Sequence, residues 1–212
     1  TNALYSVSMV STSEGWAVGV GGTILRYSAG SWQTVASPTS NWLTSVAMAS
    51  ACEGWAVGFG GTILHYTGGG WQVAASPTTS ELASVSLVSA SEGWAVGNSG
   101  IILHYSGGSW QTVDSPIPTA LYSVFMVSAG DGWAVGSAGS ILQYTGGIWE
   151  RVTSPTTAWL LSVAMVSPSE GWAVGDGPIL HYASGATATP TPAPMPNKQY
   201  LPVVPAGNSV CW

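Results

Sequence analysis

Apolar and small polar residues alternate along the chain in stretches that are too short for a helix. Residues 4–10, with the sequence LYSVSMV, show this alternation, which is typical of a strand with one buried face. Gly and Pro interrupt the pattern at short intervals, so that no stretch long enough for a helix remains. In the first repeat the pattern predicts four strands, and they cover residues 4–10, 16–19, 23–27 and 32–35.

The four-strand pattern recurs with a fixed period of 39 residues. Its marker is the pentapeptide Gly-Trp-Ala-Val-Gly, whose five tryptophans are Trp16, Trp55, Trp94, Trp133 and Trp172. A period of roughly 20 to 50 residues indicates one supersecondary unit that is repeated in space.

Four antiparallel strands in about 40 residues describe one blade of a β-propeller. We therefore predict an all-β, five-bladed β-propeller over residues 1–185, because a sheet that is apolar on both faces must pack against a neighbour on each side. The predicted blades cover about residues 1–39, 40–78, 79–117, 118–156 and 157–185. A β-solenoid is the alternative architecture, but its coils seldom need four turns per repeat.

The fifth repeat lacks its last strand. It has no counterpart of the tryptophans that mark this strand in the other repeats, so the repeats supply nineteen strands where five blades need twenty; these tryptophans are Trp32, Trp71, Trp110 and Trp149. Residues 186–198 are rich in Thr and Pro and predict a stiff, extended linker.

An apolar C-terminal arm, residues 199–212, follows this linker and is the candidate for the missing strand. Pro202 is tolerated only on an edge strand, and the fourth strand of a blade is such an edge. Whether the arm completes its own blade or a neighbour's stays open. The residues predicted to act in this arm are Tyr200, Leu201, Val203, Val204 and Trp212.

Charged residues make up only 6% of the chain, against about 25% in ordinary globular proteins. The formal net charge is −6, and the basic residues are only Arg26, Arg151 and Lys198. Nucleic acid and anionic membrane surfaces, which require clustered Lys and Arg, are therefore not expected as partners. No apolar run reaches the roughly 18 residues of a transmembrane span, so we expect no membrane insertion.

The two cysteines, Cys52 and Cys211, are predicted to form a disulfide, either within one chain or between adjacent copies. Such a bond fits an oxidising compartment. Because the sequence starts at Thr1, we interpret it as processed after removal of a secretion signal. Both features predict an extracellular or cell-surface location.

The run Gly-Trp-Ala-Val-Gly, a Gly-Gly turn, Ile-Leu-His-Tyr and Gly-Gly-x-Trp resembles the BNR/Asp-box-like propeller repeats, including those of photosystem II assembly factors. The resemblance covers about residues 1–185 and implies the propeller fold. The Asp of the family's Asp-box turn is absent from residues 28–32, and the arginine-rich patch of the assembly factors has no match. The Thr/Pro linker and the Tyr-Leu-Pro-Val-Val run resemble the C-terminal ends of secreted bacterial proteins.

We predict no enzymatic activity and no cofactor. A sialidase, as the wider Asp-box family includes, needs three arginines around a carboxylate, and this chain has two. His65, His104 and His181 share one repeat position and should lie one per blade, so they are expected to be hydrogen-bonded polar groups rather than metal ligands. Carboxylates also recur before each Gly-Trp and are expected to face solvent around one side of the ring; they are Glu14, Glu53, Glu92, Asp131 and Glu170.

Trp42 and Trp159 precede the first strand of their blades, where partial exposure is expected. Exposed indoles can stack on sugars or contact a protein partner, so these two residues are candidate glycan or partner contacts. Thr187, Thr189 and Thr191, which lie between prolines or close to them, are candidate O-glycosylation sites.

The main functional hypothesis is a secreted structural protein that self-assembles into a filament, tube or surface layer. A nearly uncharged surface, a blade edge without its last strand and an arm long enough to pair with another copy motivate it. One alternative is a carbohydrate-binding, lectin-like propeller. The other, which rests on the family resemblance, is a scaffold or assembly factor for a membrane complex.

Overall fold

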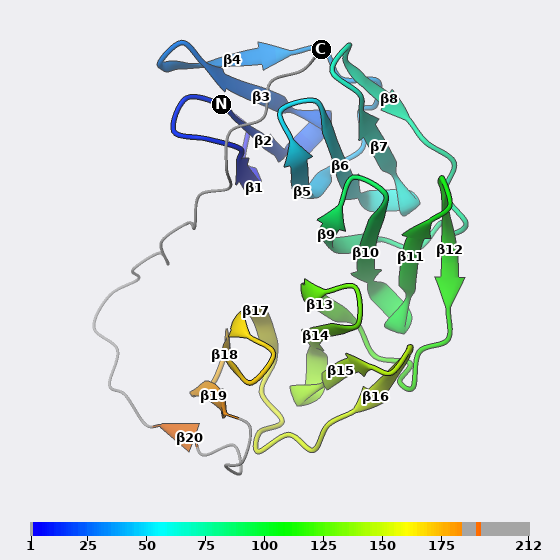
Figure 1. The fold of residues 1–212 in the computed structure, drawn as a ribbon, viewed down its shortest axis with the longest axis vertical. Helices are drawn as coiled ribbons and strands as arrows, with labels where there is room; N and C mark the ends of the chain where they lie inside the picture. The colour runs from blue at the N-terminus through cyan, green and yellow to red at the C-terminus, as the bar shows by residue number, and fades with distance from the viewer. Residues whose placement is uncertain (1, 184–189, 192–212) are drawn as a thin grey trace.

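Five four-stranded antiparallel sheets are arranged radially around a central opening in the computed structural model (Figure 1). The structure describes residues 2–183 and 190–191. Within each sheet the strands follow chain order from the centre outwards. This arrangement confirms the predicted all-β propeller.

The strands repeat in four classes. The innermost strands are β1 (Leu4–Met9), β5 (Leu43–Ser50), β9 (Leu82–Ser89), β13 (Leu121–Ser128) and β17 (Leu160–Ser167). The second strands, which carry the repeated pentapeptide, are β2 (Gly15–Gly19), β6 (Glu53–Gly58), β10 (Glu92–Gly97), β14 (Asp131–Gly136) and β18 (Glu170–Gly175). The third strands are β3 (Ile24–Ser28), β7 (Ile63–Tyr66), β11 (Ile102–Ser106), β15 (Ile141–Thr145) and β19 (Ile179–Ala183). The outermost strands are β4 (Ser31–Val35), β8 (Trp71–Val73), β12 (Ser109–Val113), β16 (Ile148–Arg151) and β20 (Pro190–Thr191).

Short 3₁₀ turns connect the second and third strands of the first four blades. They are η1 (Val20–Gly22), η2 (Phe59–Gly61), η3 (Asn98–Gly100) and η4 (Ser137–Gly139). In the part of the chain that the structure describes, no helix has the length and hydropathy of a membrane-crossing segment.

The core lies between blades rather than within them. Each interface packs the forward face of one blade against the rear face of the next, and Trp16, for example, is buried against Tyr66 and Trp71 of the second blade. Trp16 meets Trp71 edge-to-face, with ring centroids 5.4 Å apart and planes at 86°. The same pair recurs as Trp55 with Trp110.

Serines of the innermost strands tie successive blades together. The Oγ of Ser6 accepts the backbone N–H of Val46 at 3.1 Å, and this bond spans the first and second blades. Equivalent bonds join Ser45 to Val85, Ser84 to Val124 and Ser123 to Val163 at 3.2 Å. The preceding blade thus satisfies the amides of Val46, Val85, Val124 and Val163.

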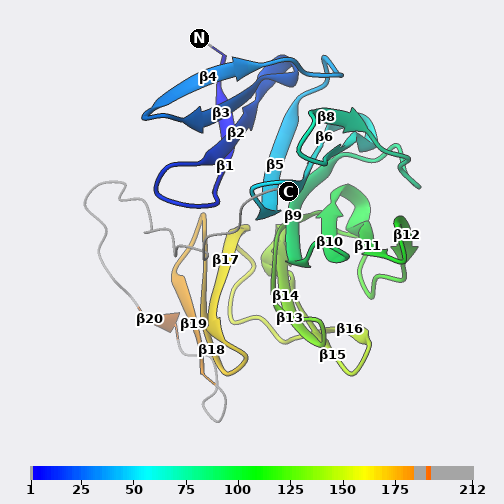
Figure 2. The same ribbon diagram turned by 45° about the horizontal axis from the view of Figure 1, so that its top comes forward.

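The described blades form an arc in which the first and fifth blades do not pack on one another as neighbours do (Figures 1 and 2). Val7 on the rear face of the first blade is 52% exposed, whereas its four equivalents are 5–8% exposed. On the forward face of the fifth blade Trp172 is 38% exposed, whereas its equivalents are 1–4% exposed. The arc therefore ends in two uncovered apolar faces, which the prediction of five equivalent blades in a closed disc did not include.

The outer edge of the fifth blade pairs with β20, which comes from the Thr/Pro segment that the sequence predicted to be a linker. Ile179 lies opposite Thr191, and Leu180 lies opposite Pro190. The prediction that the C-terminal arm, residues 199–212, supplies this strand falls outside the described residues. All the arm residues named above also lie outside them.

Glycines allow the second strand to approach the chain segment that leads into its own blade. A Cβ added to Gly136 would lie 2.0 Å from the carbonyl oxygen of Ala120, and the other blades repeat this approach. A Cβ on Gly130, in the β13–β14 hairpin of the same blade, would meet no atom within 4 Å. The repeated glycine after Trp-Ala-Val is thus required by a backbone contact.

We predict that Gly136→Ala destabilises the protein by about 3 kcal/mol or more, because backbone atoms must move to admit the methyl group. Gly130→Ala is the matched control and should leave the free energy of unfolding within about 0.5 kcal/mol of the wild type. Chemical unfolding followed by tryptophan fluorescence measures both values. Equal effects of the two substitutions would contradict the proposed contact.

Candidate binding surfaces

Three parts of the described surface are candidates for function: a row of paired carboxylates, a rim of exposed aromatic rings and the two uncovered blade faces. The carboxylates lie at the hairpins between the first and second strands. The aromatic rim lies at the opposite ends of these strands, beside the 3₁₀ turns.

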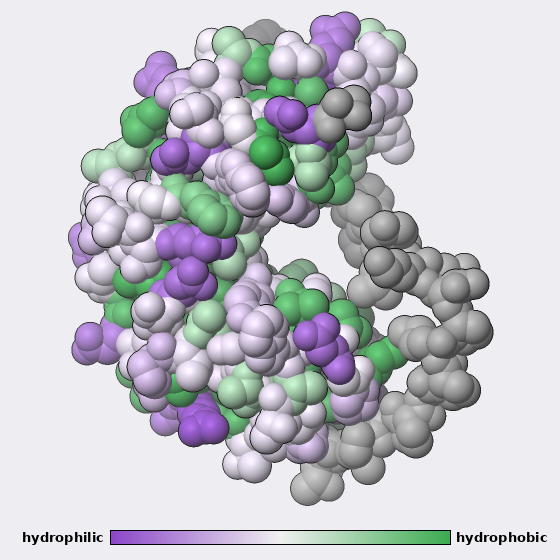
Figure 3. Space-filling view, turned by 180° about the vertical axis from the view of Figure 1, so that it is seen from behind, coloured by the Kyte–Doolittle hydropathy of each residue, from purple (hydrophilic) through white to green (hydrophobic). Residues whose placement is uncertain are grey.

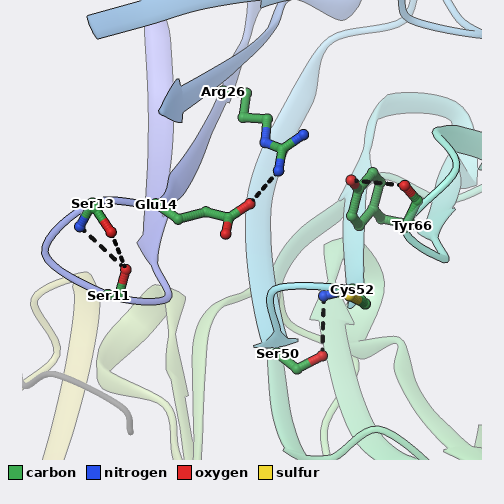
Figure 4. A network of polar contacts seen from close by, with 8 residues as sticks. Ser11, Ser13, Glu14, Arg26, Ser50, Cys52 and Tyr66 are labelled. Atoms are coloured by element: carbon green, nitrogen blue, oxygen red, sulfur yellow. Dashed lines mark hydrogen bonds and ion pairs between the residues drawn. The ribbon is translucent and has the colours of Figure 1, made fainter. Parts of the chain in front are cut away.

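The recurring carboxylates are partners of the residue at the recurring histidine position. Glu14 accepts a hydrogen bond from Arg26 (Figure 4), and Glu53 pairs with His65 in the same way within the second blade. His104 lies 3.1 Å from Glu92, and His181 lies 3.4 Å from Glu170. The expectation that these carboxylates face solvent is therefore wrong for Glu14, Glu53 and Glu92, which are partly buried, whereas the Glu170 side chain is half exposed, as expected.

Each histidine also stacks on the tryptophan of its own repeat. The rings of His65 and Trp55 are 3.9 Å apart with planes at 5°, and those of His104 and Trp94 are 4.1 Å apart. Arg26 takes the same place over Trp16, 5.4 Å from the ring centroid. The carboxylate, the cation or imidazole and the indole form a column that covers the edge of an inter-blade core.

These columns have a structural role in the fold. Among the described residues no group of three or more His, Cys, Asp or Glu side chains is placed to hold a metal ion. Because each histidine has its partner in its own blade, the columns stay one repeat apart. The sequence correctly placed the histidines one per blade, but it did not identify their partners.

The fourth blade breaks this pattern. Asp131 replaces the glutamate, Gln143 replaces the histidine, and the buried Oδ1 of Asp131 has no hydrogen-bond partner. Burial raises the pKa of the Asp131 carboxyl. Ionised Asp131 therefore costs the folded state free energy.

The aromatic rim consists of Tyr5, Trp42, Phe59, Tyr122 and Trp159. Trp42 lies between Tyr5 and Phe59, with ring centroids 6.1 and 5.2 Å away. Its carbonyl oxygen accepts the N–H of Phe59 at 2.9 Å, which fixes the loop to η2.

The same arrangement recurs three repeats later. Tyr122 and Trp159 have ring centroids 5.8 Å apart, and the carbonyl of Trp159 accepts the N–H of Asp176. Trp42 is 43% exposed and Trp159 is 52% exposed, as the sequence predicted for both. The rim partners Tyr5, Phe59 and Tyr122 were missed, although the equal spacing of Tyr5 from Trp42 and Tyr122 from Trp159 was a usable signal.

The third blade separates the two aromatic groups with polar side chains. The amide of Asn98 donates a hydrogen bond to the carboxylate of Glu81 at 3.0 Å. The face seen in Figure 3 carries small hydrophilic and hydrophobic areas side by side around the central opening. Such a mixed surface suits contacts through aromatic rings with a few hydrogen bonds rather than recognition of a highly charged ligand.

The uncovered rear face of the first blade is a shallow groove of about 520 Å³. Its lining residues are Leu4, Tyr5, Ser6, Val7, Ala17, Leu25 and Trp32. The equivalents of Leu4, Val7 and Trp32 in the other blades are buried by a preceding blade. The groove is therefore one half of an inter-blade interface without its other half.

Two predicted sites lie partly or wholly outside the described residues. Cys52 lies in the β5–β6 hairpin, where its N–H donates to Ser50 at 3.1 Å (Figure 4), but Cys211 is outside the described part of the chain. The Cys52–Cys211 disulfide stays a prediction. Thr187 and Thr189 also lie outside, and Thr191 is described only as part of β20.

The radial antiparallel sheets define the protein as a β-propeller. The family model described as "Photosynthesis system II assembly factor YCF48" matches residues 27–115, which is less than half of the chain. This match supports the resemblance to the propeller repeats of that family. No curated protein matches the sequence.

Solved structures match as propellers of low sequence identity. YCF48 from Cyanidioschyzon merolae is 18% identical with a TM-score of 0.66, and the alignment covers 88% of this chain and 68% of that one. The WD40 propeller domain of Doa1 is 14% identical with a TM-score of 0.74 and coverages of 88% and 67%. A structure of YCF48 bound to D1 peptide is 20% identical with a TM-score of 0.49 and coverages of 90% and 81%.

The fold alone does not identify a function. In all, 825 chains of solved structures match this architecture, and propellers serve many unrelated roles. The YCF48 and Doa1 propellers are longer, and this chain spans about two thirds of each.

We predict that Asp131→Asn raises the unfolding midpoint at neutral pH. The neutral amide of asparagine avoids the free-energy cost of an ionised carboxylate whose buried oxygen has no hydrogen-bond partner. The pKa of Asp131 is raised by folding, so the protonated form stabilises the protein below about pH 4, and this contribution is lost as the pH rises through the raised pKa. The gain from the substitution should therefore disappear in acid. Thermal unfolding between pH 3 and pH 8 measures this difference.

Glu92→Gln is the control in the third blade. Because Glu92 has His104 as its partner, removal of the charge should lower the midpoint rather than raise it. A fall of the midpoint for Asp131→Asn at neutral pH would contradict the assignment of Asp131 as an unpaired carboxylate.

Proposed function

We propose that this chain is a non-catalytic scaffold that binds a protein partner, in the manner of an assembly factor, and that the aromatic rim is its contact surface. The observation that carries this proposal is the rim itself, where Trp42 and Trp159 lie exposed in two equivalent aromatic groups. Exposed tryptophan and tyrosine are typical of the residues that dominate protein interfaces.

The family match supports the same function. Residues 27–115 match a model that is described as a photosystem II assembly factor, and this region contains Trp42 and Phe59. The partner is expected to be a segment of a larger complex, and a membrane complex is the partner class that the resemblance suggests. Few charges surround the rim, so binding should depend weakly on salt.

A self-assembling protein is the second candidate. The forward face of the fifth blade and the rear face of the first are the two halves of the interface that recurs four times inside the molecule. Trp172 on one face and Leu4 with Val7 on the other are exposed, whereas their equivalents are buried. An extracellular filament, tube or surface layer built from such contacts remains a proposal.

The test of the scaffold function is binding of a defined peptide set or purified complex to the full chain. Trp42→Ala and Trp159→Ala should each weaken binding on the order of 30-fold, as expected for interface hot spots. Ile148→Ala is the control, because Ile148 on β16 is exposed but lies outside both the rim and the groove of the first blade. Biolayer interferometry measures the dissociation constants.

Two outcomes would contradict this function. Binding that is unaffected by both rim substitutions would remove the rim as the contact surface. Binding to a glycan array with loss in Trp42→Ala, together with no binding to protein, would establish the lectin-like alternative instead.

We predict for the second candidate that the wild type associates in a concentration-dependent way in analytical ultracentrifugation. Val7→Glu should weaken this association at least tenfold, because it places a charge in the uncovered face. Val73→Glu, on the exposed outer strand β8, is the control and should associate like the wild type. A strict monomer at all concentrations would contradict self-assembly through these faces.

A further inference from the structure

The described residues of the fifth blade include no counterpart of an aromatic ring that each of the three preceding blades places in its rear interface. Trp71, Trp110 and Trp149 each lie beside the tyrosine of the third strand, with ring centroids 5.2–5.3 Å apart. Each also meets the pentapeptide tryptophan of the preceding blade edge-to-face, at 5.4–5.5 Å. In the rear interface of the fifth blade, Tyr182 contacts Trp133 with ring centroids 4.4 Å apart.

A cavity of about 50 Å³ lies at this place between the fourth and fifth blades. Trp133 and Val152 of the fourth blade line it, together with Leu180 and Tyr182 of the fifth. In the other interfaces the equivalents of these four residues belong to, or pack against, the core cluster that contains the outer-strand tryptophan. The cavity is therefore part of a seat for an aromatic side chain from the fourth strand.

The register of the other blades defines which strand fits this seat. In the first blade Tyr27 lies opposite Trp32, Leu25 opposite Thr34 and Ile24 opposite Val35. The aromatic ring therefore comes three residues before an aliphatic residue. The two side chains point to opposite faces, and the aliphatic one packs forward, as Val35 does.

The position directly before the aliphatic residue, which Thr34 occupies in the first blade, accepts proline. The outer-strand residue that pairs with the isoleucine of the third strand donates its N–H to the isoleucine carbonyl. Ala74 donates to Ile63 and Val152 donates to Ile141 in this way, both at 2.9 Å. The N–H of the residue before it points away from the sheet, because directions alternate along a strand. Strand β20 already has Pro190 at this position, opposite Leu180.

β20 does not bring an aromatic residue to the seat. If the register of Leu180 with Pro190 is continued by two residues, the position opposite Tyr182 is residue 188, and this residue is an alanine. Among residues 192–212, Tyr200 is the aromatic residue that is followed by valine three positions later. Pro202 then falls opposite Leu180, and Val203 falls opposite Ile179.

We propose that this edge of the fifth blade is a docking groove for an extended segment of the pattern aromatic-x-Pro-aliphatic, and that its occupant is the segment 200–203 of the same chain. Tyr200 enters the seat beside Trp133 and Tyr182, and Val203 covers the forward face of Ile179. The segment replaces β20 in the same register. This inference does not depend on the proposed function.

Attachment in the same chain favours this occupant over the arm of a second copy. The segment that connects β19 to Tyr200, residues 184–199, is ample for a return to the neighbouring strand position, since the corresponding turn of the first blade has only Ala29 and Gly30. Closure of such a loop costs only the slowly growing chain entropy, whereas a second copy must also lose translational freedom. The segment of the same chain should therefore occupy the groove at protein concentrations too low for two copies to associate.

The test measures hydrogen exchange of the His181 amide, which faces the outer strand, in the full chain. Tyr200→Ala should speed its exchange at least tenfold and lower the unfolding midpoint, and Tyr200→Trp should raise the midpoint because it restores the ring of the other blades. Leu201→Ala is the matched control and should change neither, because its position corresponds to the exposed Gln33, Gln72 and Gln111.

The same measurement over a hundredfold dilution identifies the source of the strand. Protection that is independent of concentration supports the occupant from the same chain, and protection that disappears on dilution overturns it in favour of a second copy. If Tyr200→Ala and Tyr200→Trp both leave the exchange of the His181 amide and the unfolding midpoint unchanged, β20 is the edge strand and the proposal is overturned.

Discussion

The structure depends on the packing of one indole between two blades. The tryptophan of each Gly-Trp-Ala-Val-Gly repeat lies on the forward face of its sheet, and in the first three blades it meets a tyrosine and an edge-on tryptophan of the next sheet. A single four-stranded sheet cannot cover two apolar faces, so every blade depends on both neighbours. The serine-to-amide bonds of the innermost strands join neighbouring sheets, and the glycine at the end of each second strand lets that strand approach the segment that leads into its own blade.

The candidate surfaces follow from this constraint. Where a neighbouring blade is present, the tryptophan is buried, and the histidine and glutamate of its column cover the edge of the inter-blade core. Where a neighbour is absent, at the two ends of the described arc, the same residues become exposed apolar faces. The aromatic rim differs from these faces because its rings lie in loops and at strand starts. At the equivalent positions of the third blade, the residues are not part of the core.

The sequence predicted the propeller, its repeat and its strands well, because a 39-residue period with four turns leaves few other arrangements. It also predicted the exposure of Trp42 and Trp159 from their position before the innermost strand. It could not show that Glu53 and Glu92 pair with histidines twelve residues later, since that contact depends on the register of β6 with β7 and of β10 with β11. Nor could it show the open arc, because Val7 and Val46 look the same in sequence and differ only in whether a blade lies behind them.

The most direct test of this account is a double-mutant cycle on Trp94 and Trp149, the edge-to-face pair between the third and fourth blades. The free energies of unfolding of Trp94→Leu, Trp149→Leu and the double variant give the coupling between the two rings. We expect a coupling of about 0.5–1.5 kcal/mol, as for aromatic pairs in a packed core. Strictly additive effects would contradict the view that edge-to-face indole pairs hold the blades together.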